Sequence, residues 1–297
     1  MTNERLYTEY RNRNPILPVL RQNRMFSEEA PGTYVTGVVN YQMPSDRKPA
    51  VYVSPPGTGE HRRTSSYKAV SVPIYDGRVI AADLSLDRQG FALRRHNSAV
   101  TDFYDDEQVL ERYYPEMEQM VKQATGASRV VVFDHTTRVD GGANTGNNRA
   151  PVRIVHNDYT ANSAPRRVHD LLPDEANDLL RRRFAVINVW RPIQGPVRKA
   201  PLAVIDAQSV AGDDLVATDL VYQDRTGEIY EVSANEAHRW FYFPLMEHDE
   251  VLLIKGYDSL ADGRARFTPH TAFDDPSSAA GAPARESIEI RTLVFFE

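Results

Sequence analysis

The sequence predicts a mainly β fold with flanking helices, built around a jelly roll or barrel. From residue 129 onward, short β-prone runs recur between turn residues, and only brief helical patterns intervene. The runs lie at 130–133, 152–155, 184–189, 202–205, 220–222, 229–232, 240–243, 251–254 and 288–296. Many short strands at this spacing favour a sandwich or barrel over a parallel α/β sheet.

The first 128 residues are expected to form an extension of strands and one long helix. Polar residues 1–30 indicate an irregular arm or one short helix, and the segment 43–66, rich in Pro, Gly, Ser and charge, indicates a loop. Strands are expected at 33–41, 70–75, 78–82 and 90–94. We therefore predict a single domain, 1–297, in which the extension 1–128 packs on a jelly-roll core, 129–297.

The clearest helical pattern covers 105–125. Its apolar residues recur every three or four positions, and Gly126 follows as a stop. Pro115 lies inside the pattern, so the helix is expected to begin or kink near it. Shorter helices are expected at 173–182 and 233–239.

Composition excludes several classes of protein. The net charge of −6 argues against a nucleic-acid binder, and the absence of cysteine excludes disulfides, thiolate metal sites and cysteine nucleophiles. No stretch is apolar over the ~18 residues that a membrane span needs, and the N-terminus shows no signal peptide. We expect a cytoplasmic protein without a membrane or nucleic-acid partner, and the oligomeric state stays open.

The chemistry is predicted to centre on His156 and Asp158. They are two positions apart at the end of an expected strand, so both side chains point to one face. His270, before the last strand, is the best third ligand, and two histidines with one carboxylate bind Fe(II) and leave three positions open. A simpler interpretation of the pair is a hydrogen bond at a strand end. His135 is a second strand-end candidate for the lining of the site.

Arg285 and Ser287 point to a second ligand. On a strand they face the same side, where a guanidinium and a hydroxyl suit the distal carboxylate of a 2-oxoacid whose other end chelates the metal. Arg291 faces that side too, and it could instead be the carboxylate anchor.

These residues resemble the Fe(II)/2-oxoglutarate-dependent oxygenases, and specifically the fungal and bacterial hydroxylase/desaturase family of secondary metabolism, which includes gibberellin-desaturase-like and cephamycin-hydroxylase-like proteins. The similar stretches are 188–193 (Asn-Val-Trp-Arg-Pro-Ile), 201–206, 240–244, 249–258, 269–274 and 285–291. The resemblance implies a double-stranded β-helix, Fe(II), 2-oxoglutarate as cosubstrate and O2. His270 and Arg285 lie fifteen positions apart, more than is usual in the family, so Arg191 is a third candidate for the cosubstrate carboxylate.

We expect hydroxylation, desaturation or cyclisation of a small molecule, either a secondary metabolite or an amino-acid derivative. Its contacts are expected in the segments 43–66, 138–149 and 161–168, and from the side chains of Tyr159, Asn188, Trp190 and His135. The alternatives are a metal-dependent cupin-type enzyme without 2-oxoglutarate and a non-catalytic jelly-roll binding protein.

Overall fold

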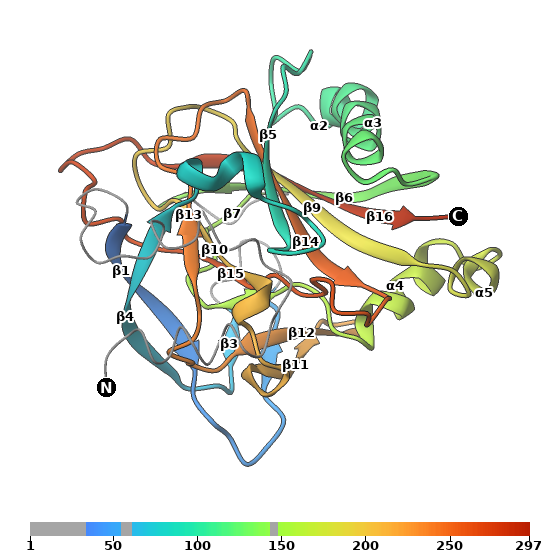
Figure 1. Ribbon diagram of the computed structural model, residues 1–297, viewed down its shortest axis with the longest axis horizontal. Coiled ribbons are helices and arrows are strands. Elements are labelled where there is room, and N and C mark those ends of the chain that lie inside the picture. Colours follow the sequence, from blue (N-terminus) through green and yellow to red (C-terminus); the bar gives the residue numbers. More distant parts are fainter. Residues whose placement is uncertain (1–33, 55–60, 143–147) are drawn as a thin grey trace. The chain divides into compact units, whose positions relative to one another are not determined.

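In the computed structural model, the structure describes residues 34–54, 61–142 and 148–297. The arm expected at 1–30 lies outside them. Val35–Glu297 forms one compact unit. The described strands form two sheets, and strands that are hydrogen-bonded neighbours run mostly antiparallel (Figure 1).

The first sheet consists, in spatial order, of β1 (Tyr34–Gln42), β4 (Tyr67–Asp76), β13 (Trp240–Tyr242), β10 (Leu202–Ile205), β15 (His270–Ala272), β8 (His156–Asn157), β12 (Thr226–Val232), β11 (Leu215–Val221), β2 (Ala50–Tyr52) and β3 (Arg62–Arg63). The second sheet consists of β5 (Phe91–Arg95), β14 (Glu250–Asp258), β9 (Phe184–Pro192), β16 (Glu286–Phe295), β6 (Arg129–Val139) and β7 (Asn148–Arg149). This arrangement confirms the predicted mainly β jelly-roll core. Strands from the first 128 residues are hydrogen-bonded members of both sheets, while the domain division at residue 128 stays a prediction.

The predicted long helix is present with an irregular first part. Asp105 accepts hydrogen bonds from the backbone of Glu107 and Gln108 and starts α2 (Asp106–Gln108). A π-helical turn, Val109–Tyr113, joins it to α3 (Tyr114–Thr125), which begins at the predicted proline. The helix ends at Gly126, whose φ of +71° is a left-handed conformation that favours glycine.

Several predicted elements are wrong. The expected strand 78–82 is a 3-10 helix (Gly77–Asp83), and no helix forms at 233–239. The run 152–155 is not a regular strand. Two helices occupy 163–179, α4 (Ser163–Leu171) and α5 (Ala176–Leu179). Pro165 lies in the first turn of α4, where its missing N–H costs nothing, so it is compatible with the helix.

The two faces of the second sheet have different functions. Met117 and Val121 of α3 pack with Ile187, Ile288 and Ile290 in a hydrophobic cluster, so α3 covers one face (Figure 1). Alternate residues of β9 and β16 point to the opposite face, toward the first sheet. Polar residues of β9 and β16 on that face therefore lie opposite the side chains of the first sheet that point inward.

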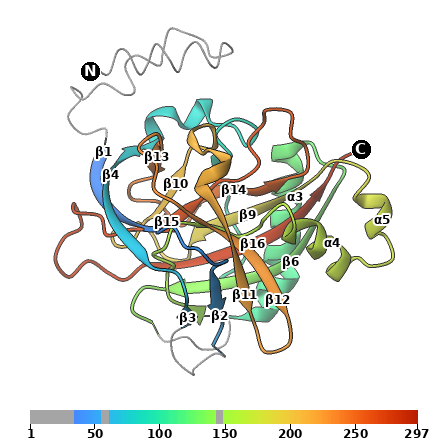
Figure 2. The ribbon, with the colours of Figure 1, turned by 90° about the horizontal axis from the view of Figure 1, so that it is seen from below.

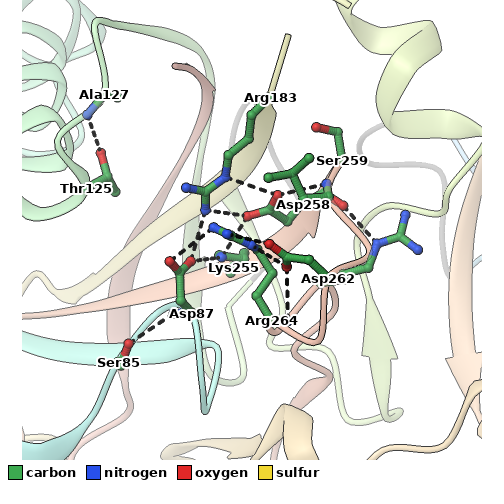
Figure 3. A network of polar contacts seen from close by, with 12 residues as sticks. Ser85, Asp87, Thr125, Ala127, Arg183, Lys255, Asp258, Ser259, Asp262 and Arg264 are labelled. Atoms are coloured by element: carbon green, nitrogen blue, oxygen red, sulfur yellow. Dashed lines mark hydrogen bonds and ion pairs between the residues drawn. The ribbon is translucent and has the colours of Figure 1, made fainter. Parts of the chain in front are cut away.

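A buried ionic cluster fixes the end of β14. The Lys255 Nζ donates to Asp87 Oδ1 at 2.6 Å and to Asp258 Oδ2 at 2.8 Å, and Arg183 donates to both of these carboxylates (Figure 3). Lys255 is 1% and Asp258 0% exposed. At the exposed rim Asp262 pairs with Arg264. The cluster ties the end of β14 to the start of β9, the strand that carries Asn188 and Trp190.

We predict that Asp258→Ala lowers the free energy of unfolding by about 3 kcal/mol, because it leaves the buried Lys255 and the partly buried Arg183 short of a carboxylate. Asp262→Ala, the control in the same cluster, should leave the midpoint unchanged, since its pair is solvated. Urea titrations of both variants make the comparison, and equal midpoints for Asp258→Ala and the wild type would refute the assignment.

His238 is a buried titratable residue in the first sheet's core. Its Nδ1 contacts the Tyr41 hydroxyl at 2.8 Å and its Nε2 contacts Asp214 Oδ2 at 3.1 Å. Burial lowers the pKa of His238, against a smaller raising effect of Asp214. The unfolded chain, with an ordinary histidine pKa of about 6.5, therefore binds this proton more readily than the folded chain.

His238 should make the protein less stable as pH falls below about 6.5, with the loss ending below the lowered folded-state pKa. His238→Gln removes this titration, so its free energy of unfolding should fall less than that of the wild type between about pH 7 and 5. Parallel denaturation curves across this range test the sign, and identical slopes would contradict it.

Candidate metal centre

Two histidines meet on neighbouring strands of the first sheet. His156 in β8 and His270 in β15 are register partners, and their ring centroids are 4.6 Å apart. His156 Nδ1 lies 2.7 Å from the carbonyl oxygen of Ile154, and His270 Nδ1 lies 3.1 Å from that of Thr268. A carbonyl oxygen can only accept, so each Nδ1 carries the hydrogen and each Nε2 keeps its lone pair for a metal.

Asp158 completes the predicted set of ligands. It directly follows β8, and its Oδ1 is 3.4 Å from His156 Nε2. The ligand atoms of His156, Asp158 and His270 all lie within 4.8 Å of one another. Two imidazoles and one carboxylate on one side of an ion match the facial arrangement that binds Fe(II).

The second sheet holds the Asp158 carboxylate from across the interior. Its Oδ2 accepts from Asn188 Nδ2 at 2.7 Å and from Arg291 Nε at 3.4 Å. The Glu289 carboxylate also accepts from both residues, from Asn188 at 3.1 Å and from Arg291 at 2.9 Å. Asn188 and Arg291 are register partners on β9 and β16. The first sheet thus supplies the histidines, and the second orients the carboxylate.

The electrostatics favour the protonation states that a metal requires. Burial would raise the pKa of Asp158, but the neighbouring His156 and the positive charge of Arg291 lower it well below its ordinary value. Burial, and then His156, lower the pKa of His270. The aspartate is therefore ionised and His270 neutral near neutral pH, the forms that bind a divalent metal.

A small cavity beside the histidines is lined by Arg285 and Trp190, together with Arg138 and Glu289. Arg285 is 3% exposed and donates from Nη1 to the Ala200 carbonyl oxygen at 2.7 Å. Its Nε has no partner, and neither do Ser287 Oγ and Trp190 Nε1, although all three are buried. Buried donors normally have acceptors, so three without one indicate that an oxygen-rich ligand would supply the missing acceptors.

Arg285 has the electrostatic character of an anion site. Within the described ranges no carboxylate forms an ion pair with it. Burial and then the charge of Arg138 lower the pKa of Arg285 to about 9, which reflects a cation without a counterion. Its guanidinium carbon lies 5.5 Å from the Trp190 ring centroid, so Trp190 fixes the position of the group. A bound carboxylate would supply the missing negative charge.

Other predicted site residues lie elsewhere. Arg191 points to the α3 side of the second sheet, over the rings of Phe103 and Tyr113. It does not reach the metal centre, because consecutive strand residues face opposite sides and Trp190 takes the inner one. His135 is also on the outer side, where it contacts the Tyr114 hydroxyl and Asp106.

Two further predicted residues have structural surroundings. Arg291 is committed to Asp158, Glu289 and Asp134, so it holds the metal-side carboxylates. Tyr159 packs with the hydrophobic cluster under α4, and burial raises its pKa. Of the four residues predicted to contact substrate, Asn188 holds Asp158 and Trp190 lines the small cavity. Neither Tyr159 nor His135 lines that cavity.

A cleft of about 890 Å³ opens onto His156 and Asp158. Two of the three segments predicted to contact substrate contribute to it, 43–66 through Val51, Val53 and Arg63, and 138–149 through Arg138 and Arg149. The segment 161–168 does not border the cleft. From Ser163 onward its residues belong to α4. The apolar wall includes Val152 and Ile154.

Sequence reasoning missed the wall formed by the β11–β12 hairpin, which Figure 2 shows beside β2. It contributes Leu220, Ile229 and Glu231. Glu231 is fully buried, pairs in register with His156, and accepts from Tyr67 at 2.6 Å. Alternation along 226–232 places residues 229 and 231 on one face, but no sequence signal pairs this strand with β8.

Comparisons with known proteins agree with this geometry. A family described as "Oxidoreductase/YMDC permease-like domain" matches residues 39–295. A hydroxylase/desaturase from Hormonema carpetanum is 37% identical, with 78% of this chain and 85% of the relative covered. An Fe(II)/2-oxoglutarate-dependent dioxygenase from Aspergillus novofumigatus is 34% identical, covering 72% of this chain and 81% of the relative.

Solved structures are similar as well. The iron and alpha-ketoglutarate-dependent endoperoxidase NvfI matches with a TM-score of 0.80 at 30% identity, over 89% of this chain and 98% of that one.

Among the described residues, none of the helices has the length and apolar character of a membrane span.

We predict that Asn188→Ala weakens binding of a divalent metal about 10- to 100-fold, because Asp158 loses its shortest orienting hydrogen bond. Asn235→Ala is the matched control, since Asn235 donates to Asp214, a carboxylate outside the metal centre. Calorimetric titration of metal-free protein with Mn²⁺ measures both affinities. Equal affinities in Asn188→Ala and the wild type would show that Asn188 does not position the ligand.

Proposed function

The chain belongs to a family of Fe(II)/2-oxoglutarate-dependent dioxygenases that includes fungal hydroxylases and desaturases, and we propose that His156, Asp158 and His270 hold its Fe(II). Arg285 and Ser287 bind the distal carboxylate of 2-oxoglutarate. The observation that carries the assignment is the joint position of three converging ligand atoms and a buried, unpaired arginine beside them.

The residues fit the absent iron and cosubstrate. When bound, Fe(II) supplies the redox chemistry by which O2 oxidises 2-oxoglutarate to succinate and CO2 and a substrate C–H bond is broken. Three protein ligands leave three positions open, enough for a bidentate 2-oxoacid and O2. Because Arg285 lines the same small cavity as His156 and His270, one ligand can meet both the arginine and the metal.

The protein's own contribution is binding, orientation and exclusion of water. Asn188 and Arg291 hold Asp158 with one oxygen turned toward His156, so the ligand set is organised before the metal arrives. Trp190 and Arg285 position the cosubstrate. The His156 and Asp158 side chains are only 11% and 14% exposed, so a substrate in the cleft would shield the metal from water.

We propose that the large cleft receives the substrate, a small molecule of secondary metabolism. It opens onto His156 and Asp158, and its wall combines Val51, Val152 and Ile229 with arginines such as Arg138. A mainly apolar body with a few polar groups suits this lining. Both outcomes begin with loss of hydrogen from one C–H bond: hydroxylation then forms a C–O bond at that carbon, whereas desaturation removes a second hydrogen from its neighbour.

We predict that Arg285→Gln weakens 2-oxoglutarate binding about 10- to 100-fold, because a charge-assisted contact to the carboxylate is lost. The measurement is titration of Fe(II)-loaded protein with 2-oxoglutarate without oxygen, followed by the visible charge-transfer absorption of the chelate. Fe(II)-dependent succinate release under oxygen should need proportionately more 2-oxoglutarate in the variant.

Arg198→Gln is the control, since Arg198 is an exposed arginine outside both cavities of the site. Wild-type affinity in Arg285→Gln would assign the carboxylate to another residue. If neither absorption nor succinate forms in the wild type, the cupin-type or binding-protein alternative replaces the proposal.

A further inference from the structure

Arg191 is a buried cation on the side of the second sheet away from the metal. It is 2% exposed, and one guanidinium nitrogen, Nη2, donates to the His248 carbonyl oxygen. Its Nε and Nη1 have no hydrogen-bond partner, and no carboxylate of the described residues forms an ion pair with it. An arginine this buried is normally paired, because removing a charge from water is costly.

The aromatic neighbours compensate only part of that cost. The guanidinium carbon lies 5.1 Å from the Phe103 ring centroid and 5.5 Å from that of Tyr113. Ring faces stabilise a cation but accept no strong hydrogen bond from the free N–H groups. The buried Tyr113 hydroxyl also has no hydrogen-bond partner, although the nearby guanidinium lowers its pKa against the larger raising effect of burial. Apart from each other, the Tyr113 hydroxyl and the free guanidinium nitrogens therefore lack a partner here.

A cavity of about 360 Å³ lies against Arg191. This volume exceeds that of a single ordered water several-fold. The amides of Asn97 and Gln194 and the imidazole of His248 line it and can donate hydrogen bonds. Its one carboxylate, Asp102, accepts from the Tyr104 backbone at 2.9 Å. The lining thus offers a cation and several donors to a guest.

We propose that this cavity is a binding site for a small oxyanion, a carboxylate or a phosphate, held by the free N–H groups of Arg191. Both classes match a guanidinium, which forms charge-assisted hydrogen bonds to either. The site is separate from the cosubstrate cavity, since Trp190 and Arg191 point to opposite faces of β9. It needs neither iron nor 2-oxoglutarate.

The test compares thermal unfolding of the full chain in sodium phosphate, sodium acetate and sodium chloride of equal ionic strength. Every protein carries Arg285→Gln, which disables the cosubstrate cavity, and the protein with no further change serves as the wild type. An anion present at about ten times its Kd should raise Tm of the wild type by about 2–3 °C over chloride. The phosphate and acetate arms identify which oxyanion the site prefers. Calorimetric titration should give one site per chain.

Arg191→Met should abolish the anion-dependent rise, whereas Arg198→Met, which removes the same charge from an exposed position, should keep it. If Arg191→Met does not fold, Gln194→Trp keeps Arg191 and fills the cavity mouth, and it should also lose the rise. The proposal is overturned if neither anion stabilises the wild type more than chloride, or if a folded Arg191→Met or Gln194→Trp responds like the wild type.

Discussion

The carboxylate of Asp158 connects the two sheets at the proposed metal centre, and the rest of the site depends on this contact. The first sheet brings His156 and His270 into register on β8 and β15, yet a carboxylate at the end of a two-residue strand has little local support. Asn188 and Arg291 provide it from the second sheet. Asp158 therefore takes this position only when both sheets are correctly packed. We expect folding and metal binding to be coupled for this reason.

Holding that carboxylate requires burial of many charged groups. Arg285, just before β16, and Ser287, Glu289 and Arg291 within it face the first sheet, where a purely structural strand would carry apolar side chains. Arg291 and Glu289 compensate each other, but Arg285 keeps an uncompensated charge. This arrangement is expected of a binding site, because a structure that satisfied Arg285 internally would have nothing to offer a carboxylate. The apolar cluster under α3 and the ionic cluster around Asp258 stabilise the scaffold around this polar strip.

Much of the site was predictable because its chemistry is local. His156 and Asp158 share a face through their spacing alone, and so do Arg285 and Ser287. The choice among arginines was harder. Arg191 lies in β9 and Arg285 directly precedes β16, and only the pairing of Trp190 with Glu289 determines that Arg191 faces away from the metal centre. A shift of one residue would exchange the two faces, and no local pattern fixes it.

The remaining misses have similar physical causes. β8 is too short to show periodicity, and the 3-10 helix at Gly77–Asp83 carries a β-prone composition. The wall from β11 and β12 depends on long-range pairing with β8, which a single sequence does not reveal. Local chemistry thus predicted the residues that converge at the candidate metal centre, and tertiary pairing determined which neighbouring side chains contact them.

A crystal structure of the protein with Mn²⁺ in place of iron, with the ion located by its anomalous scattering, tests the central claim most directly. We predict one strong peak bound by Nε2 of His156, Nε2 of His270 and a carboxylate oxygen of Asp158, with Asn188 and Arg291 still on the other oxygen. A peak elsewhere, or an ion that one of these three residues does not bind, would contradict the account.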